Sequence, residues 1–145
     1  MNKINQLFLA FLTLFIVFSS FKAEQQNTEK EQVREAIQYY FQAHATGNGE
    51  YLREAFHPVA NLYFVRDSEL AQYTLEEYVA LFDGTPGEDE DQRIRSIDNI
   101  EISGNAAIAT ITLDYPNGIY TDYMSMLKID GQWKIVNKTF YIDPK

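Results

Sequence analysis

The chain has 145 residues, of which 46% are hydrophobic and 14% aromatic, and this is enough for one folded domain with an ordinary core. Its 21 acidic residues outnumber 12 basic ones, so the net charge is −9 and the chain lacks the basic surface that a nucleic-acid partner requires. The absence of cysteine excludes disulfides, thiolate catalysis and cysteine-ligated zinc.

Residues 1–23 predict a secretory signal peptide. Lys3 precedes an apolar run over residues 7–18, and small residues up to Ala23 offer a cleavage site. The run is short for a bilayer, which takes about 20 apolar residues to cross. We therefore expect a secreted or periplasmic protein, with residues 24–145 as a single domain and no stable membrane span after cleavage. An uncleaved signal anchor that tethers the chain to the membrane is the alternative.

Residues 24–82 predict three helices and one strand. Thr28 is expected to cap the first helix after a polar leader, with an apolar stripe that includes Tyr40 and His44. This helix stops at Gly47, since Gly47-Asn48-Gly49 is a helix-ending run. The expected elements that follow are a short helix over 50–56, a strand over 61–66, a turn over 68–73 and a helix over 74–82 with buried apolar residues up to Phe82.

Residues 83–92 (DGTPGEDEDQ) predict an exposed acidic loop. The loop lacks the alternating acids and central glycine of a calcium-binding loop, so no metal is expected there. Residues 93–103 predict the next strand, and Gly104-Asn105 turns the chain back.

Residues 106–142 predict a three-stranded antiparallel meander. Its turns are expected at Asn117-Gly118 and Asp130-Gly131, because both dipeptides suit type I′ hairpins. The resulting register predicts one mostly apolar face for the helices to cover. This face is expected to carry Ala109, Ile111, Leu113, Met124, Met126, Trp133 and Ile135, tyrosines 115, 120 and 141 at one end, and three polar interruptions, Asp122, Asn137 and Thr139. Lys138 and Phe140 are expected on the opposite, mixed face.

The runs REAIQYYFQAHATGN, EYLREAFHPVANLYF and TDYMSMLKIDGQWKIVNKTFY resemble the nuclear-transport-factor-2-like superfamily, and within it the lumazine-binding (SnoaL-like) branch. The resemblance covers residues 29–142. It implies an α+β fold of the cystatin-like roll type, in which N-terminal helices cover a cone-shaped, curved antiparallel sheet over a deep pocket. It also implies a homodimer. It does not imply one chemistry, since this fold hosts isomerases, dehydratases, binding proteins and scaffold modules.

Asp122 is the strongest candidate for a functional residue. A carboxylate on an apolar face is a candidate general acid or base, or an anchor for a polar ligand group. The structural alternative is that Thr139 and a backbone amide satisfy it. Asn137 is expected beside it as a second polar contact, and Trp133 with Met124 as an apolar floor suited to a flat ring.

Three further residues are candidates for the pocket wall. Tyr40 offers a phenol and His44 an imidazole from the inward stripe of the first helix, although both also fit simple core packing. His57 lines the pocket or caps the end of the second helix. Two histidines without clustered acids favour neither a metal site nor a cofactor.

We therefore expect a protein that binds a small hydrophobic or aromatic ligand. One alternative is an isomerase or dehydratase in which Asp122 works with a histidine; another is a non-catalytic module that dimerises through its outer sheet face. Relatives that resemble ketosteroid isomerase carry a general-base acid near the start of the strand after the second helix, whereas residues 57–65 hold no acid. Whether the chain is an enzyme, and which residues are catalytic, is left open at this level.

Overall fold

The computed structural model describes the backbone of residues 3–145 and the side chains from residue 24 onward. The chain divides into two compact units, Met1–Glu31 and Gln32–Lys145. The predicted signal peptide lies outside the residues whose side chains are described. Within the described part, no helix combines the length and the apolar character needed to cross a membrane.

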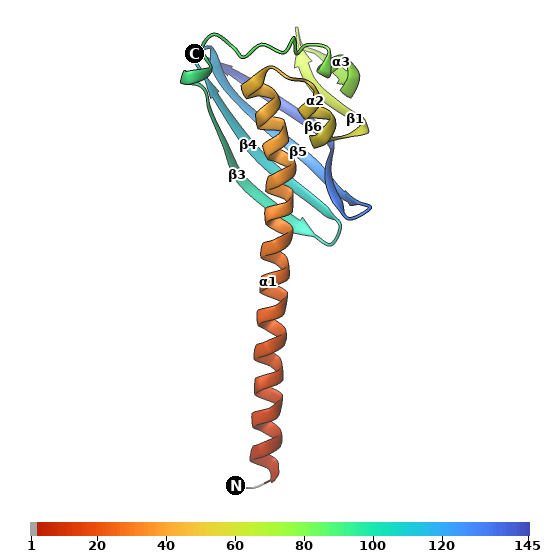
Figure 1. The fold of residues 1–145 in the computed structure, drawn as a ribbon, viewed down its shortest axis with the longest axis vertical. Helices are drawn as coiled ribbons and strands as arrows, with labels where there is room; N and C mark the ends of the chain where they lie inside the picture. The colour runs from red at the N-terminus through yellow and green to blue at the C-terminus, as the bar shows by residue number, and fades with distance from the viewer. Residues whose placement is uncertain (1–2) are drawn as a thin grey trace. The chain divides into compact units, whose positions relative to one another are not determined.

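Three helices and six strands make up the described fold, with a short 3-10 turn between α3 and β3 (Figure 1). The helices are α1 (Lys3–Thr46), α2 (Glu50–Ala55) and α3 (Leu75–Val79), and the 3-10 turn is η1 (Glu90–Gln92). The strands are β1 (Phe56–Arg66), β2 (Glu69–Thr74), β3 (Ile94–Ser103), β4 (Ala106–Tyr115), β5 (Gly118–Ile129) and β6 (Gln132–Pro144).

The six strands form one curved sheet in the order β2-β1-β6-β5-β4-β3 (Figure 1). Strands β1 and β6 pair in parallel, and the other neighbours are antiparallel. Buried side chains of α1, α2 and α3 join those of the inner sheet face in one core. Ile37 and Leu52 are fully buried in it, and each such side chain contributes about 1.5–3 kcal/mol relative to an exposed one. The expected α+β fold with helices over a curved sheet is confirmed.

The predicted start of the first helix is wrong. Thr28 lies inside α1, where its hydroxyl donates to the carbonyl oxygen of Glu24 at 3.0 Å instead of capping a helix end. Polar residues such as Glu, Lys and Gln have high helix propensity, so a polar segment does not have to be a leader. The predicted stop is confirmed, because α1 ends at Thr46 and Gly47 takes a φ of 68°.

A hairpin between β1 and β2 was not predicted. Asp67 and Ser68 have φ values of 52° and 66°, and the strand pairing resumes directly on either side of them. These two residues form the turn without glycine, so residues 69–74 are a strand and the predicted turn over 68–73 is wrong. Strand β1 also begins at Phe56, earlier than the predicted residue 61.

The capping box of α3 is confirmed. The Thr74 hydroxyl accepts from the amide of Glu77 at 3.3 Å, and the Glu77 carboxylate accepts from the amide of Thr74 at 2.8 Å. The helix ends at Val79, three residues before the predicted end. Leu81 is 60% exposed, so its predicted burial is wrong.

The two hairpins of the meander differ in how well the sequence predicts them. Asp130 and Gly131 take φ values of 50° and 82°, as a type I′ turn requires, so this turn is confirmed. The first turn lies one residue earlier than predicted, because Tyr115 pairs with Gly118. The pairing of β4 with β5 is therefore shifted by two residues, and a shift by two keeps each side chain on its predicted face.

A β-bulge interrupts the pairing of β5 with β6. Met126 pairs with Ile135, but the preceding Ser125 pairs with Asn137, so Val136 is an extra residue on β6. Such an extra residue inverts the facing of every later residue of its strand.

The inversion brings Lys138 onto the inner face, where it is 3% exposed. Phe140 turns inward with it, and Asn137 and Thr139 turn outward. The prediction that Asn137 and Thr139 share the face of Asp122 is therefore wrong. The seven apolar residues predicted on the inner face are buried, whereas Tyr141 is 66% exposed and does not belong to it.

Candidate functional site

Three residues that are distant in the sequence form a buried polar cluster, which we call the buried triad: Tyr40 on α1, Asp122 on β5 and Lys138 on β6. The Tyr40 hydroxyl donates to Asp122 Oδ2 at 2.6 Å. Lys138 Nζ lies 2.9 Å from the same oxygen and 2.6 Å from the Tyr40 hydroxyl oxygen. Tyr40 and Asp122 are 0% exposed, so an amine, a phenol and a carboxylate meet in the interior.

One hydrogen-bond acceptor of the triad has no partner among the described residues. Asp122 Oδ1 is buried and has no hydrogen-bond partner among the described residues. Removing two charges from water costs several kcal/mol per ion, and a buried pair often stabilises a fold no more than apolar residues of the same size do. Stability therefore does not by itself explain an ion pair at this position.

Burial shifts the pKa values of two residues of the triad, Tyr40 and Lys138. It raises the pKa of Tyr40 well above its ordinary value, and the charge of Asp122 raises it further, so Tyr40 stays a phenol. Burial also lowers the pKa of Lys138, although Asp122 acts in the opposite direction.

A cavity of about 550 Å³ lies above the triad, and tyrosines 40, 73, 78, 115 and 120 line it. We call it the tyrosine cavity. Its volume is in the range of small-molecule pockets. Apolar wall is supplied by Phe64, Val65, Leu81, Leu113, Phe140 and Ile142. Lys138, Arg66 and Arg93 are its basic residues.

His44 lines this cavity, and its Nε2 lies 2.9 Å from the Tyr78 hydroxyl. Burial lowers the pKa of His44 well below its ordinary value, and the nearby cations Lys138, Arg95 and Arg93 lower it further. The imidazole is therefore neutral. His44 hydrogen-bonds with Tyr78, whereas Asp122 hydrogen-bonds with Tyr40 and Lys138, so among the described residues the predicted pairing of Asp122 with a histidine is not formed.

Two arginines contact the ring of Tyr115, which lines the cavity. The Arg93 guanidinium lies 4.6 Å from the centre of the Tyr115 ring, and that of Arg95 lies 5.1 Å from it. Asp89 pairs with Arg93 at 2.6 Å and Glu90 with Arg95 at 2.6 Å. The acidic loop thus holds two cations against an aromatic ring of the cavity.

The other predicted site residues lie elsewhere. His57 is on β1 outside the cavity, with its Nδ1 3.4 Å from the amide nitrogen of Val59. Met124 is 1% exposed in the core and does not line the tyrosine cavity. Asn137 faces away from it because of the bulge. Their roles as ligand contacts stay predictions that the geometry of this cavity does not favour.

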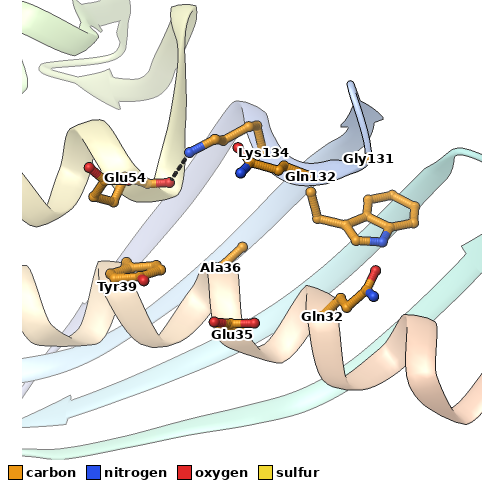
Figure 2. Close-up of a pocket in the computed structure, with 9 residues that line it drawn as sticks. Gln32, Glu35, Ala36, Tyr39, Glu54, Gly131, Gln132 and Lys134 are labelled. Atoms are coloured by element: carbon orange, nitrogen blue, oxygen red, sulfur yellow. Dashed lines mark hydrogen bonds between the residues drawn. The ribbon is translucent and has the colours of Figure 1, made fainter.

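Trp133 lines a second, smaller cavity of about 280 Å³. Figure 2 shows this cavity between α1, the end of α2 and the β5–β6 turn, with Tyr39 and Glu35 on one side and Gln132 on the other. The Lys134 amine donates across it to the carbonyl oxygen of Glu54. No buried cluster of ionisable groups lies in it among the described residues, so the tyrosine cavity is the better candidate site.

Sequence reasoning missed Lys138, Tyr78 and Arg93. The missing signal is the bulge: Lys134 and Lys138 are four residues apart and would share one face of a regular strand. Of the residues that the structure describes, no three His, Cys, Asp or Glu side chains are placed to hold a metal ion.

The fold and the cavity define a protein of the nuclear-transport-factor-2-like class, a curved sheet whose helices enclose a small-molecule pocket. The model of the family described as "Putative lumazine-binding" matches residues 28–141. The chain belongs to this family.

Individual relatives are consistent with this assignment. The aldolase FrzH from Cladobotryum sp is 30% identical over 109 residues, which cover 73% of this chain and 85% of that protein. A nuclear-transport-factor-2-like protein of unknown function from Shewanella baltica superimposes with a TM-score of 0.74 at 24% identity, over 81% of this chain and 96% of that one. A similar protein of unknown function from Methylobacillus flagellatus gives a TM-score of 0.67 at 28% identity, over 79% and 92% of the two chains.

Proposed function

We propose that the chain binds a small aromatic or amphipathic molecule in the tyrosine cavity. The observation that carries this proposal is the buried triad at the floor of a cavity with aromatic and aliphatic walls. Apolar walls with a few convergent polar groups are the usual composition of small-molecule sites. Tyrosine rings offer both stacking surface and hydroxyl groups to such a ligand.

The charges of the cavity favour an anionic ligand. Lys138, Arg66 and Arg93 line it, and none of the described lining residues is an acid. The chain as a whole carries a net charge of −9, so three basic lining residues contrast with the rest of the chain, although Asp122 pairs with Lys138 and Asp89 with Arg93. A cavity of one sign attracts ligands of the other. We therefore include a carboxylate or another anionic group in the proposed ligand.

A fluorescence titration with anilinonaphthalene sulfonate, an aromatic and anionic probe, tests this function. Saturable binding to the full chain is expected. Arg93→Gln is expected to weaken it about fivefold, because a charge interaction at a partly exposed site is worth about 1 kcal/mol. The matched control is Arg53→Gln, a surface arginine that pairs with Glu50 and lies outside the cavity. No saturable binding, or equal weakening by both variants, would contradict the proposal.

A second candidate function is enzymatic, and the observation in its favour is the meeting of amine, phenol and carboxylate in the triad. The relative FrzH carries the name aldolase, and an aldolase makes or breaks a carbon–carbon bond next to a carbonyl group. A carbonyl compound would meet Lys138 at the cavity floor. Isomerase or dehydratase chemistry by Asp122 with a histidine has less support, since His44 contacts Tyr78 instead.

We also propose that the chain is exported and that the mature protein begins near Glu24. The support is the order of Lys3, the apolar run and the small residues that end at Ala23. Intact-mass measurement of protein recovered from the periplasm of a Gram-negative host is expected to give a chain that starts near Glu24. Full-length chain confined to the membrane fraction would instead identify an uncleaved signal anchor.

A further inference from the structure

Lys138 is a primary amine at the floor of the tyrosine cavity. It lines the cavity, yet only 3% of the residue is exposed, and its Nζ is in hydrogen-bond contact with two other members of the triad. A cation that only attracts an anionic ligand does not need a phenol and a carboxylate at its nitrogen. These contacts indicate a further role for the amine.

The amine is desolvated, with the rings of Tyr40, Tyr78 and Phe140 at 4.8, 5.6 and 4.7 Å from Nζ. Burial opposes the charged form of the amine, whereas the ring faces and the Asp122 carboxylate favour it. Burial lowers the pKa of Lys138 below its ordinary value, so a larger fraction of the amine is neutral than in a surface lysine. Lysines in desolvated pockets are the ones that attack carbonyl groups.

We propose that Lys138 forms a reversible imine with an aldehyde or ketone that is bound in the tyrosine cavity. The proposal rests on the proposed function, since the carbonyl compound must first bind there. The substrate class is an aromatic or amphipathic carbonyl compound, and its anionic group would meet the Arg93 side of the cavity.

Tyr40 and Asp122 can supply and accept the protons that imine formation requires. Neutral Nζ adds to the carbonyl carbon and forms the C–N bond, while the carbonyl oxygen takes a proton from the Tyr40 hydroxyl and Asp122 accepts one proton from the nitrogen, which gives a carbinolamine. Asp122 then returns its proton to the carbinolamine oxygen, the C–O bond breaks to release water, and the second nitrogen proton goes to the Tyr40 oxygen, so Tyr40 and Asp122 regain their starting forms. Amine and carbonyl thus give imine and water, with no oxidant or reductant. The Tyr40 hydroxyl oxygen lies 2.6 Å from Nζ, and Asp122 Oδ2 lies 2.9 Å from it. Both distances are within the reach that such proton transfers need.

Reductive trapping of the imine tests the proposal. The full chain is incubated with para-formylbenzoate, an aromatic and anionic aldehyde, and cyanoborohydride converts any imine into a stable secondary amine. Peptide mass spectrometry is expected to find Lys138 labelled about tenfold faster than surface lysines, because binding raises the local concentration of the aldehyde. The analogue para-methylbenzoate, which has no carbonyl carbon to attack, is expected to protect Lys138 by competition.

Variants test whether the fast labelling requires the amine of Lys138. Lys138→Arg is expected to abolish the fast labelling, whereas Lys134→Arg, four residues earlier on the same strand and outside the cavity, is expected to leave it unchanged. At a saturating concentration of the aldehyde, Tyr40→Phe is expected to slow labelling of Lys138 about tenfold or more, because a general acid is lost. If Lys138→Arg does not fold, protection of the wild-type chain by para-methylbenzoate supplies the same comparison.

The outcomes distinguish the two proposals. Binding of para-methylbenzoate without preferential labelling of Lys138 would overturn the imine and leave the binding function standing. Failure of both benzoates to bind would count against the binding function itself. Labelling of Lys138 that Tyr40→Phe does not slow would show that the triad is not the proton-transfer group.

Discussion

Replacing Lys138 with methionine is expected to lower the free energy of unfolding by about 3–5 kcal/mol, the usual cost of removing one partner of a buried ion pair. The reason is Asp122, which is 0% exposed and pairs with Lys138 at 2.9 Å. The Tyr40 hydroxyl would still donate to Asp122 Oδ2, but a neutral phenol does not replace the positive charge, and Oδ1 has no partner among the described residues. Urea denaturation of both proteins, with an unchanged slope, measures the difference.

Two further variants show whether the cost belongs to the ion pair. Lys134→Met removes a lysine from the same strand but from the second cavity, and it is expected to cost less than about 1 kcal/mol. Adding Asp122→Asn to Lys138→Met removes the uncompensated charge and is expected to recover more than half of the loss. A loss of under about 1 kcal/mol in Lys138→Met would mean that Lys138 and Asp122 do not act as a buried ion pair.

Local signals in the sequence predict much of the fold. The Asp130-Gly131 turn and the Thr74 capping box are each set by side chains within a few residues, and both are confirmed. The Asp67-Ser68 turn is missed because neither residue is glycine, although both take positive φ values where β1 pairs with β2.

The site depends on a feature that no local pattern predicts. Asp122 lies on β5, whereas the extra residue of the bulge lies on β6. Period-two alternation therefore places Asp122 correctly on the inner face. Lys138 follows the bulge on β6, so the same alternation places it on the wrong face and puts Asn137 in the pocket. One extra residue therefore exchanges an amide for an amine on the inner face of the sheet.

Acidification is expected to destabilise the fold through His44. Its pKa is well below the ordinary value of 6.5, because of burial and the cations Lys138, Arg95 and Arg93. Below pH 6.5 the unfolded chain takes up a proton at His44 and the folded chain does not, so stability is full above this pH and falls as the pH drops toward the folded pKa. The loss from this one group is about 1.4 kcal/mol per pH unit within that window.

Unfolding curves of the wild-type chain and of His44→Gln, measured between pH 7 and pH 5, isolate this effect. Carboxylates contribute equally to both proteins and cancel in the difference, so below pH 6.5 the variant is expected to lose less stability, by a difference that approaches about 1.4 kcal/mol per pH unit. Glutamine can still bond the Tyr78 hydroxyl that His44 meets at 2.9 Å. His57→Gln is the matched control and is expected to keep the wild-type slope, because His44 is still present. Parallel curves for the wild-type chain and His44→Gln would show instead that the imidazole accepts a proton in the folded cavity as easily as in water, and that the cations around the tyrosine cavity do not act on a group inside it.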